Sequence, residues 1–101
     1  MSRVSGKPYF VYVLWSEIGR RFYIGISEDV SHRIMQHNQG LSRWTARYKP
    51  WILVYQEAQA DYRSARLREN ELKRQKGGDG LCRLTGLDRR RFEGHSPQSG
   101  S

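Results

Sequence analysis

FYIGISEDVSHRIMQH, residues 22–37, joins a strand pattern directly to a helix pattern. Its first half is rich in aromatic and β-branched side chains, which favour a pleated strand. The two acidic residues after Ser27 supply the negative charge that stabilises a helix N-terminus, and Gly40 is a natural helix end. The sequence therefore predicts a strand over 21–27 and a helix over about 28–39, with Ser27 as the N-terminal cap.

A second strand pattern, YFVYVLW at residues 9–15, precedes this segment. The short polar linker between the two patterns predicts a β-hairpin. If its loop comprises residues 16–19, antiparallel pairing sets Tyr12 directly opposite Tyr23. Because side chains alternate along a strand, we expect both tyrosines on one face of the sheet, with Gly25 leaving a gap beside them.

Arg33 and His37 are four residues apart in the predicted helix, so their side chains are neighbours. At 100° per residue they flank the apolar stripe formed by Val30 and Ile34. Each has an ordinary structural explanation, since an arginine is most often a surface residue and a helix histidine most often packs or caps. Strand tyrosines, likewise, are more often part of the core or its rim than catalytic.

The remaining elements follow in simple order. The connector SRWTARYKP (42–50) predicts one short helical turn, and WILVYQE (51–57) predicts a third strand that begins after a proline. Residues 61–76 carry the strongest helix pattern, with Asp61 as its cap and a glycine pair as its end. A further short helix is expected within LCRLTGLDRRRF (81–92).

These patterns predict an α/β (α+β) domain: a three-stranded antiparallel sheet flanked by helices, in the order strand, strand, helix, short helix, strand, helix, helix. With 101 residues the chain has room for one small core. We expect a flexible lead-in over 1–8, a single domain over 9–92 and a tail over 93–101 that is disordered by composition.

The net charge of +8 comes from eighteen basic residues against ten acidic ones, and fourteen of the basic residues are arginine. The guanidinium fork binds phosphate bidentately, so this bias favours a polyanion such as nucleic acid over a merely solvated basic surface. One cysteine excludes an internal disulfide, and the three scattered histidines give no zinc spacing. Because the longest apolar run has seven residues and no signal peptide is evident, we expect a cytoplasmic protein without a membrane span.

Glu69 lies inside the apolar stripe of the predicted helix over 61–76. A buried carboxylate without a cation costs several kcal/mol of desolvation, so Glu69 needs a positive partner. One candidate is an ion pair with Lys73 or Arg66 on the same helix. The other is a divalent metal, since Mg²⁺ accepts a carboxylate together with water.

Taken together, these elements resemble the GIY-YIG endonuclease superfamily in its small single-domain branch. The motifs VYVL, FYIGIS, RIMQH, LVYQE and SARLRENELK occur in this order and span about residues 9–76. Two departures stand out: FVY replaces the first triplet, although its tyrosine is kept, and the late asparagine of some members is not evident. The second departure leaves part of the site unassigned.

The resemblance implies a metal-dependent endonuclease that hydrolyses phosphodiester bonds in DNA, acting in repair, recombination or DNA processing. Its catalytic residues would be Tyr12, Tyr23, Arg33, His37 and Glu69. Glu69 would also bind the cofactor, Mg²⁺ or Mn²⁺. We further expect substrate contacts from Gly25, Arg43, Thr45, Arg47 and Lys73. Single-stranded or branched DNA is a candidate substrate, RNA is not excluded, and the chain would be a monomer or a weak homodimer.

Two other classes of function fit the same sequence. The first is a non-catalytic nucleic-acid-binding module whose contact surface combines Arg43, Trp44, Arg47 and Tyr48. The second is a ribosome or protein adaptor that uses the basic run at residues 89–91. Convergence of the polar residues on one face of the sheet favours the nuclease.

Overall fold

The computed structural model describes residues 8–41, 43–75 and 77–92. Its elements are β1 (Tyr9–Ser16), β2 (Arg21–Ser27), α1 (Val30–Asn38), α2 (Arg43–Ala46), β3 (Trp51–Gln59), α3 (Tyr62–Lys73), α4 (Gly77–Thr85) and a 3₁₀ helix (Arg89–Phe92). This order confirms the predicted fold class, including the short helix in the connector. The expected tail, and the expected lead-in apart from Pro8, lie outside the described residues.

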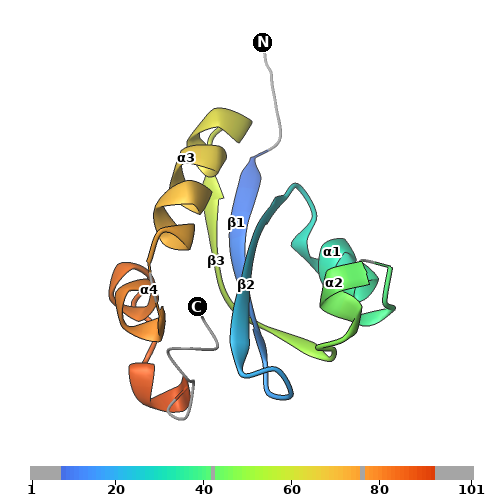
Figure 1. Ribbon diagram of the computed structural model, residues 1–101. Helices are drawn as coiled ribbons and strands as arrows, with labels where there is room; N and C mark the ends of the chain where they lie inside the picture. Colours follow the sequence, from blue (N-terminus) through green and yellow to red (C-terminus); the bar gives the residue numbers. More distant parts are fainter. Residues whose placement is uncertain (1–7, 42, 76, 93–101) are drawn as a thin grey trace.

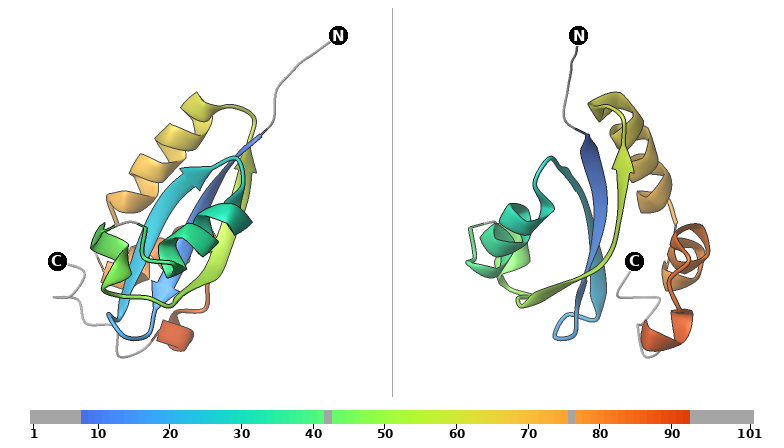
Figure 2. Two further views of the ribbon diagram at one scale, coloured as in Figure 1. Left: turned by 90° about the vertical axis from the view of Figure 1, so that its right-hand side faces the viewer. Right: turned by 180° about the vertical axis from the view of Figure 1, so that it is seen from behind.

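The three strands form one sheet in the order β2-β1-β3, and both pairs are antiparallel. α1 and α2 lie on one face of the sheet, whereas α3 and α4 lie on the other (Figures 1 and 2). The central strand β1 is therefore covered on both sides, and its last six residues are all buried. Among the described residues, no helix has the length and apolar character needed to cross a membrane.

Alternate residues of β1 enter two separate cores. On the face covered by α1, Tyr12 and Leu14 pack with Val30 and Trp51. On the opposite face, the neighbouring residues of β1 pack with Ala65, Leu72 and Leu81, among other side chains. The alternation of side chains in a strand thus places Tyr12 in the layer of α1 and α2, away from the layer of α3.

The hairpin register differs from the predicted one by two residues. Tyr12 pairs with Gly25, and Tyr23 pairs with Leu14 instead. The strand continues to Ser16 because its buried hydroxyl donates to the Tyr48 carbonyl at 2.6 Å and accepts the Gly19 amide at 2.9 Å. A shift of two residues preserves the side-chain alternation, so both tyrosines still face the same side as predicted.

Helix boundaries confirm one predicted cap and correct another. Asp61 caps α3 by accepting the Ser64 amide at 2.8 Å. α1 is capped by Asp29, which accepts the His32 amide at 3.0 Å, and not by Ser27. The hydroxyl of Ser27 accepts the Asp29 amide instead, so it supports the turn before the cap.

The glycine pair after residue 76 was expected to close the predicted helix over 61–76, and this prediction was wrong. α3 already ends at Lys73, and α4 begins at Gly77. α4 carries Leu81 into the same core as Leu72. The chain therefore turns before the glycines, and α4 packs as a separate short helix in the same layer as α3.

Arg68 ties the layer of α3 and α4 to the sheet. Its guanidinium pairs with Glu57 of β3 and with Glu71 of α3, each at 2.9 Å, and donates to the Leu84 carbonyl of α4 at 3.0 Å. Glu57 also accepts hydrogen bonds from Tyr55 and Gln59. This partly buried network holds the helix that carries Glu69 in a set position.

Candidate active site

Tyr12 is at the centre of the candidate site. Its side chain is fully buried, and its hydroxyl lies 3.2 Å from His37 Nε2. Gly25 lies opposite on β2, and a Cβ placed there would come within 2.6 Å of the Tyr12 hydroxyl oxygen. Only glycine therefore leaves space for the tyrosine ring to lie across β2, which explains the gap expected from the sequence.

Gly25→Ala should destabilise the domain through this collision. The Tyr12 ring is buried and held by His37, so it cannot swing aside. An overpacked core costs about 1–3 kcal/mol, which at about 4–8 °C per kcal/mol lowers the melting temperature by roughly 4–24 °C in a domain of this size. Thermal unfolding followed by circular dichroism measures the change. A melting temperature equal to the wild type would contradict the packing argument.

Tyr23 joins Tyr12 and His37 despite the corrected register. Its ring centroid is 4.8 Å from that of His37 and 6.3 Å from that of Tyr12. Unlike Tyr12, Tyr23 is only partly buried. Tyr23 is therefore the tyrosine through which the site opens toward solvent.

Arg33 supplies positive charge to this cluster from α1. It is partly buried, and its guanidinium donates to Gln36 Oε1 at 2.8 Å. Arg33 lowers the pKa of Tyr12 through a hydrogen bond and through its charge, and its charge also lowers the pKa of His37. The predicted i, i+4 relation thus brings Arg33 and His37 to the same tyrosine.

His37 and Thr45 form the inner wall of the site. His37 is 1% exposed, and its Nδ1 lies 2.9 Å from Thr45 Oγ1. In neutral imidazole one nitrogen donates and the other accepts, so His37 links the Tyr12 hydroxyl to Thr45. Thr45 is fully buried, as Tyr12 is, and its contact with substrate stays a prediction. In this structure its side chain orients the histidine.

Burial is the main reason that the pKa of Tyr12 is raised above the ordinary tyrosine value of 10. Tyr23 and Glu69 raise this pKa further, whereas Arg33 lowers it without reversing the shift. Tyr12 is consequently a neutral hydroxyl at pH 7. A role as a base would require additional positive charge beside it.

The pKa of His37 is lowered from 6.5, chiefly by burial and then by Arg33. The unfolded chain therefore binds the proton more tightly, so the stability contributed by neutral His37 is complete above about pH 6.5 and is lost below it. Each pH unit below 6.5 costs up to about 1.4 kcal/mol until the lowered pKa is reached.

Urea unfolding between pH 7.5 and 5 tests this expectation. His37→Gln should be less stable than the wild type at pH 7.5 but should lose less stability on acidification. His32→Gln is the matched control, because His32 is exposed on the same helix. Equal pH slopes for the wild type and His37→Gln would show that His37 does not titrate as described.

Glu69 enters from the opposite layer, which corrects the expectation that all the polar residues share one face of the sheet. It lies on α3 and is 8% exposed. Its two oxygens lie 2.9 Å from Lys73 Nζ and 3.9 Å from Arg66 Nε, so the ion pair expected from the sequence is present. Its charge nevertheless raises the pKa of Tyr12. This effect of Glu69 is weaker than the effects of burial, Tyr23 and Arg33 on the same pKa.

The donor set around Glu69 fits one kind of metal. Among residues 8–41, 43–75 and 77–92, no group of three or more His, Cys, Asp or Glu side chains gathers into a metal site. A single carboxylate suits Mg²⁺ or Mn²⁺ that keeps most of its waters and shares the rest of its sphere with a phosphate. Lys73 is half exposed, so its ammonium group can leave the carboxylate for solvent.

The remaining predicted substrate residues differ in accessibility. Arg43 and Arg47 are exposed at α2 and just beyond it, where a polyanion can reach them. Gly25 is buried beneath Tyr12, where it shapes the site, and its contact with substrate stays a prediction. Lys73 is engaged with Glu69.

Trp51 is a site residue that the sequence reasoning missed. It is 2% exposed, its indole donates to the Thr45 carbonyl at 2.8 Å, and its ring lies 6.0 Å from that of Tyr23. In the sequence it reads as the first residue of a strand. The proline before it is the single hint, since it marks where the connector must return to the sheet.

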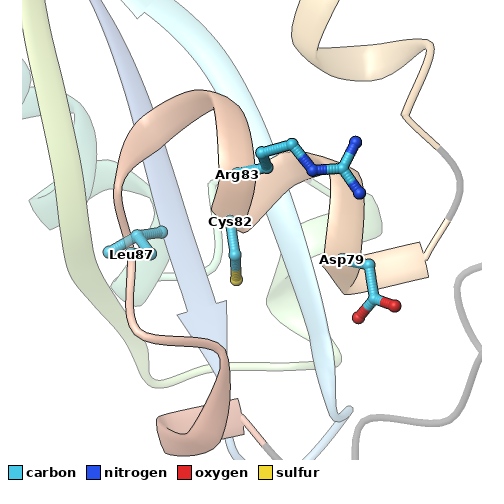
Figure 3. A pocket seen from close by; sticks show the side chains of 4 residues that line it. All are labelled: Asp79, Cys82, Arg83 and Leu87. Atoms are coloured by element: carbon cyan, nitrogen blue, oxygen red, sulfur yellow. The ribbon is translucent and has the colours of Figure 1, made fainter.

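A pocket on α4 lies away from this cluster. It is lined by Asp79, Cys82, Arg83 and Leu87, in the layer that covers the opposite face of the sheet (Figures 1 and 3). None of these residues contributes to the surroundings of Tyr12. This pocket is therefore separate from the candidate site around Tyr12.

The chain belongs to the GIY-YIG family, since the GIY-YIG catalytic domain matches residues 8–80. This span includes both tyrosines, Arg33, His37 and Glu69. Membership supports a nuclease-type function acting on nucleic acid, with a divalent metal as the general requirement of the class.

Small bacterial relatives share most of this length. A UPF0213 protein of Lacticaseibacillus paracasei is 39% identical over 70 residues, which cover 68% of this chain and 78% of the relative. A UPF0213 protein of Staphylococcus epidermidis is 36% identical over 66 residues, covering 64% of this chain and 79% of the relative. No solved structure matches the chain significantly.

Proposed function

We propose that this protein is a metal-dependent endonuclease that hydrolyses phosphodiester bonds in DNA. The observation that carries the proposal is the cluster of polar groups around His37. The Tyr12 hydroxyl lies 3.2 Å from His37 Nε2, and the Tyr23 ring centroid lies 4.8 Å from that of His37. The charge of Arg33 acts on the pKa of both Tyr12 and His37. Such coupled groups are typical of catalytic sites. The net charge of +8 favours a polyanionic substrate.

Phosphodiester hydrolysis needs an oriented water, stabilised charge on the phosphoryl oxygens and a neutralised leaving oxygen. In the proposed mechanism the Arg33 guanidinium binds a non-bridging oxygen of the scissile phosphate. The Tyr12 hydroxyl, together with Tyr23 at the more open side, orients the attacking water. His37 is a positioning residue, because it is buried and acts through its contact with Tyr12.

Glu69 is the residue proposed to hold the metal. A bound Mg²⁺ or Mn²⁺ would supply Lewis-acid charge to the phosphate and would lower the pKa of nearby oxygen acids. Lys73 would release the carboxylate in that state and become free to pair with the substrate backbone. This exchange also removes the ion pair that now satisfies Glu69.

The direct test is to incubate the purified protein with end-labelled single-stranded, duplex and branched DNA in Mg²⁺ or Mn²⁺. Denaturing gels should show new fragments that disappear with EDTA. Absence of cleavage on every substrate with both metals would contradict the proposal. The DNA structure that is cleaved best in this panel would also indicate whether repair, recombination or another form of DNA processing is the more suitable role.

A second candidate is a non-catalytic nucleic-acid-binding module. The observation in its favour is that both oxygens of Glu69 already face cations of the same helix. Binding of labelled DNA without cleavage across Mg²⁺ and Mn²⁺ would support this reading. Binding accompanied by metal-dependent fragments would exclude it.

A further inference from the structure

Four aromatic rings gather beside the candidate site, and we refer to them as the aromatic cluster: Tyr23, Trp44, Tyr48 and Trp51. Trp44 stacks on Trp51 with an interplanar angle of 25° and a centroid distance of 6.2 Å. Its ring also lies 6.1 Å from that of Tyr23 and 5.2 Å from that of Tyr48. The cluster therefore extends without a break from Tyr23 of the candidate site to α2.

Trp44 is the exposed member of this cluster. It is 44% exposed, whereas Trp15 and Trp51 are each 2% exposed. The buried Trp51 supports one side of Trp44, so the ring is braced by packing while much of its surface stays open. A rigid, partly open indole next to a catalytic tyrosine is a suitable surface for another flat ring.

Positive charge surrounds the aromatic cluster. The Arg21 guanidinium lies 4.5 Å from the Tyr48 ring centroid and donates to the Gly19 carbonyl at 3.2 Å, so it is held beside the rings. Arg43 and Arg47 are exposed on either side of Trp44 in sequence. An occupant that is both flat and anionic matches this combination, and a nucleotide has both properties.

We propose that Trp44 is a stacking platform for an unpaired base of single-stranded nucleic acid, placed beside the phosphate that Arg33 and Tyr12 would engage. The inference rests on the proposed function in that the substrate is nucleic acid. It goes further by selecting strands with unpaired bases, because a base within a duplex has both faces covered by its neighbours. Arg21, Arg43 and Arg47 would contact the backbone on either side.

Binding without metal tests the platform separately from catalysis. Fluorescence anisotropy with a labelled oligothymidylate in EDTA compares the wild type with Trp44→Ala and Trp44→Phe. Loss of one base stack should weaken binding about 5- to 150-fold for Trp44→Ala, while Trp44→Phe keeps most of the affinity. Tyr62→Ala is the matched control, since Tyr62 is an aromatic residue exposed to 49% on α3, in the other layer.

A length-matched abasic strand separates stacking from charge. The wild type and Trp44→Ala should bind this strand equally, because it offers phosphates without bases. Intrinsic fluorescence gives a second measurement that does not depend on the variant folding normally. Oligothymidylate should quench the emission of the wild type, and the abasic strand should not, because the other two tryptophans are buried.

The outcomes distinguish this inference from the proposed function. Unchanged affinity of Trp44→Ala for oligothymidylate, equal loss on the abasic strand, or no quenching would overturn the platform, even if the wild type cleaves DNA. Equally tight wild-type binding to duplex and single strand would also overturn it. Base-dependent binding and quenching without cleavage would instead support the platform and contradict the nuclease. Cross-linking of Trp44 to a protein partner with no DNA binding would refute both.

Discussion

Glu69→Gln should abolish metal-dependent cleavage, lowering kcat by at least about a thousandfold. An amide keeps the shape of the carboxylate but has no charge with which to hold a hydrated divalent cation. Loss of metal charge at a phosphoryl centre is worth several kcal/mol, and about 4 kcal/mol corresponds to a factor of a thousand. Single-turnover cleavage on denaturing gels, with Mg²⁺ varied, measures the effect.

The fold should survive this substitution. Lys73 is 53% exposed, so the ion pair lost with Glu69 contributes only about 0–1 kcal/mol to the free energy of unfolding. Glu17→Gln is the matched control, because Glu17 forms an exposed ion pair with Arg20 at 3.2 Å in the hairpin between β1 and β2 and should retain cleavage. If Glu69→Gln nicks DNA at the wild-type rate, Glu69 is a structural ion-pair residue and not the metal ligand.

Arg33→Ala should lower kcat by about a hundred- to a thousandfold, as removal of one donor to a transition-state oxygen does in other enzymes. The partly buried guanidinium is placed beside Tyr12, and its charge is felt by both Tyr12 and His37. Because charge on the phosphoryl oxygens grows during the reaction, KM should change much less than kcat. Steady-state kinetics on the preferred substrate separates the two parameters.

Two further variants sharpen this test. Arg33→Lys keeps the charge but loses the planar fork, so only part of the activity should return. Arg47→Ala removes an exposed arginine beyond α2, and it should weaken binding and reduce the salt dependence with little effect on kcat. Equal losses in kcat and binding for Arg33→Ala would mean that Arg33 is merely a phosphate clamp.

Local chemistry was enough to predict most of the elements. Asp61 was identified as a cap because its side chain acts on an amide three residues away, and α3 begins at the next residue. The same reasoning chose Ser27 for α1, yet Asp29 caps it. Two suitable side chains lie within three positions there, and only the path of the chain after β2 selects between them.

The candidate site required longer-range information. Thr45 has the sequence context of an exposed connector, but the return of Trp51 to the sheet buries it against His37. The spacing of Glu69 in its helix correctly indicated a buried carboxylate with cation partners. It did not indicate the layer, because a helical pattern shows which face is buried and not which side of a sheet it covers.

The sequence by itself determined the order of strands and helices, the common face of Tyr12 and Tyr23, and the pairing of Arg33 with His37 along one helix. These features depend on periodicity within a segment, which acts over a few residues. The tertiary structure alone decided that Gly25 lies opposite Tyr12, that Thr45 is buried, and that Glu69 lies in the far layer. The physical reason is that register and layer are set by contacts between distant segments, such as the hydrogen bond from Ser16 to the Tyr48 carbonyl.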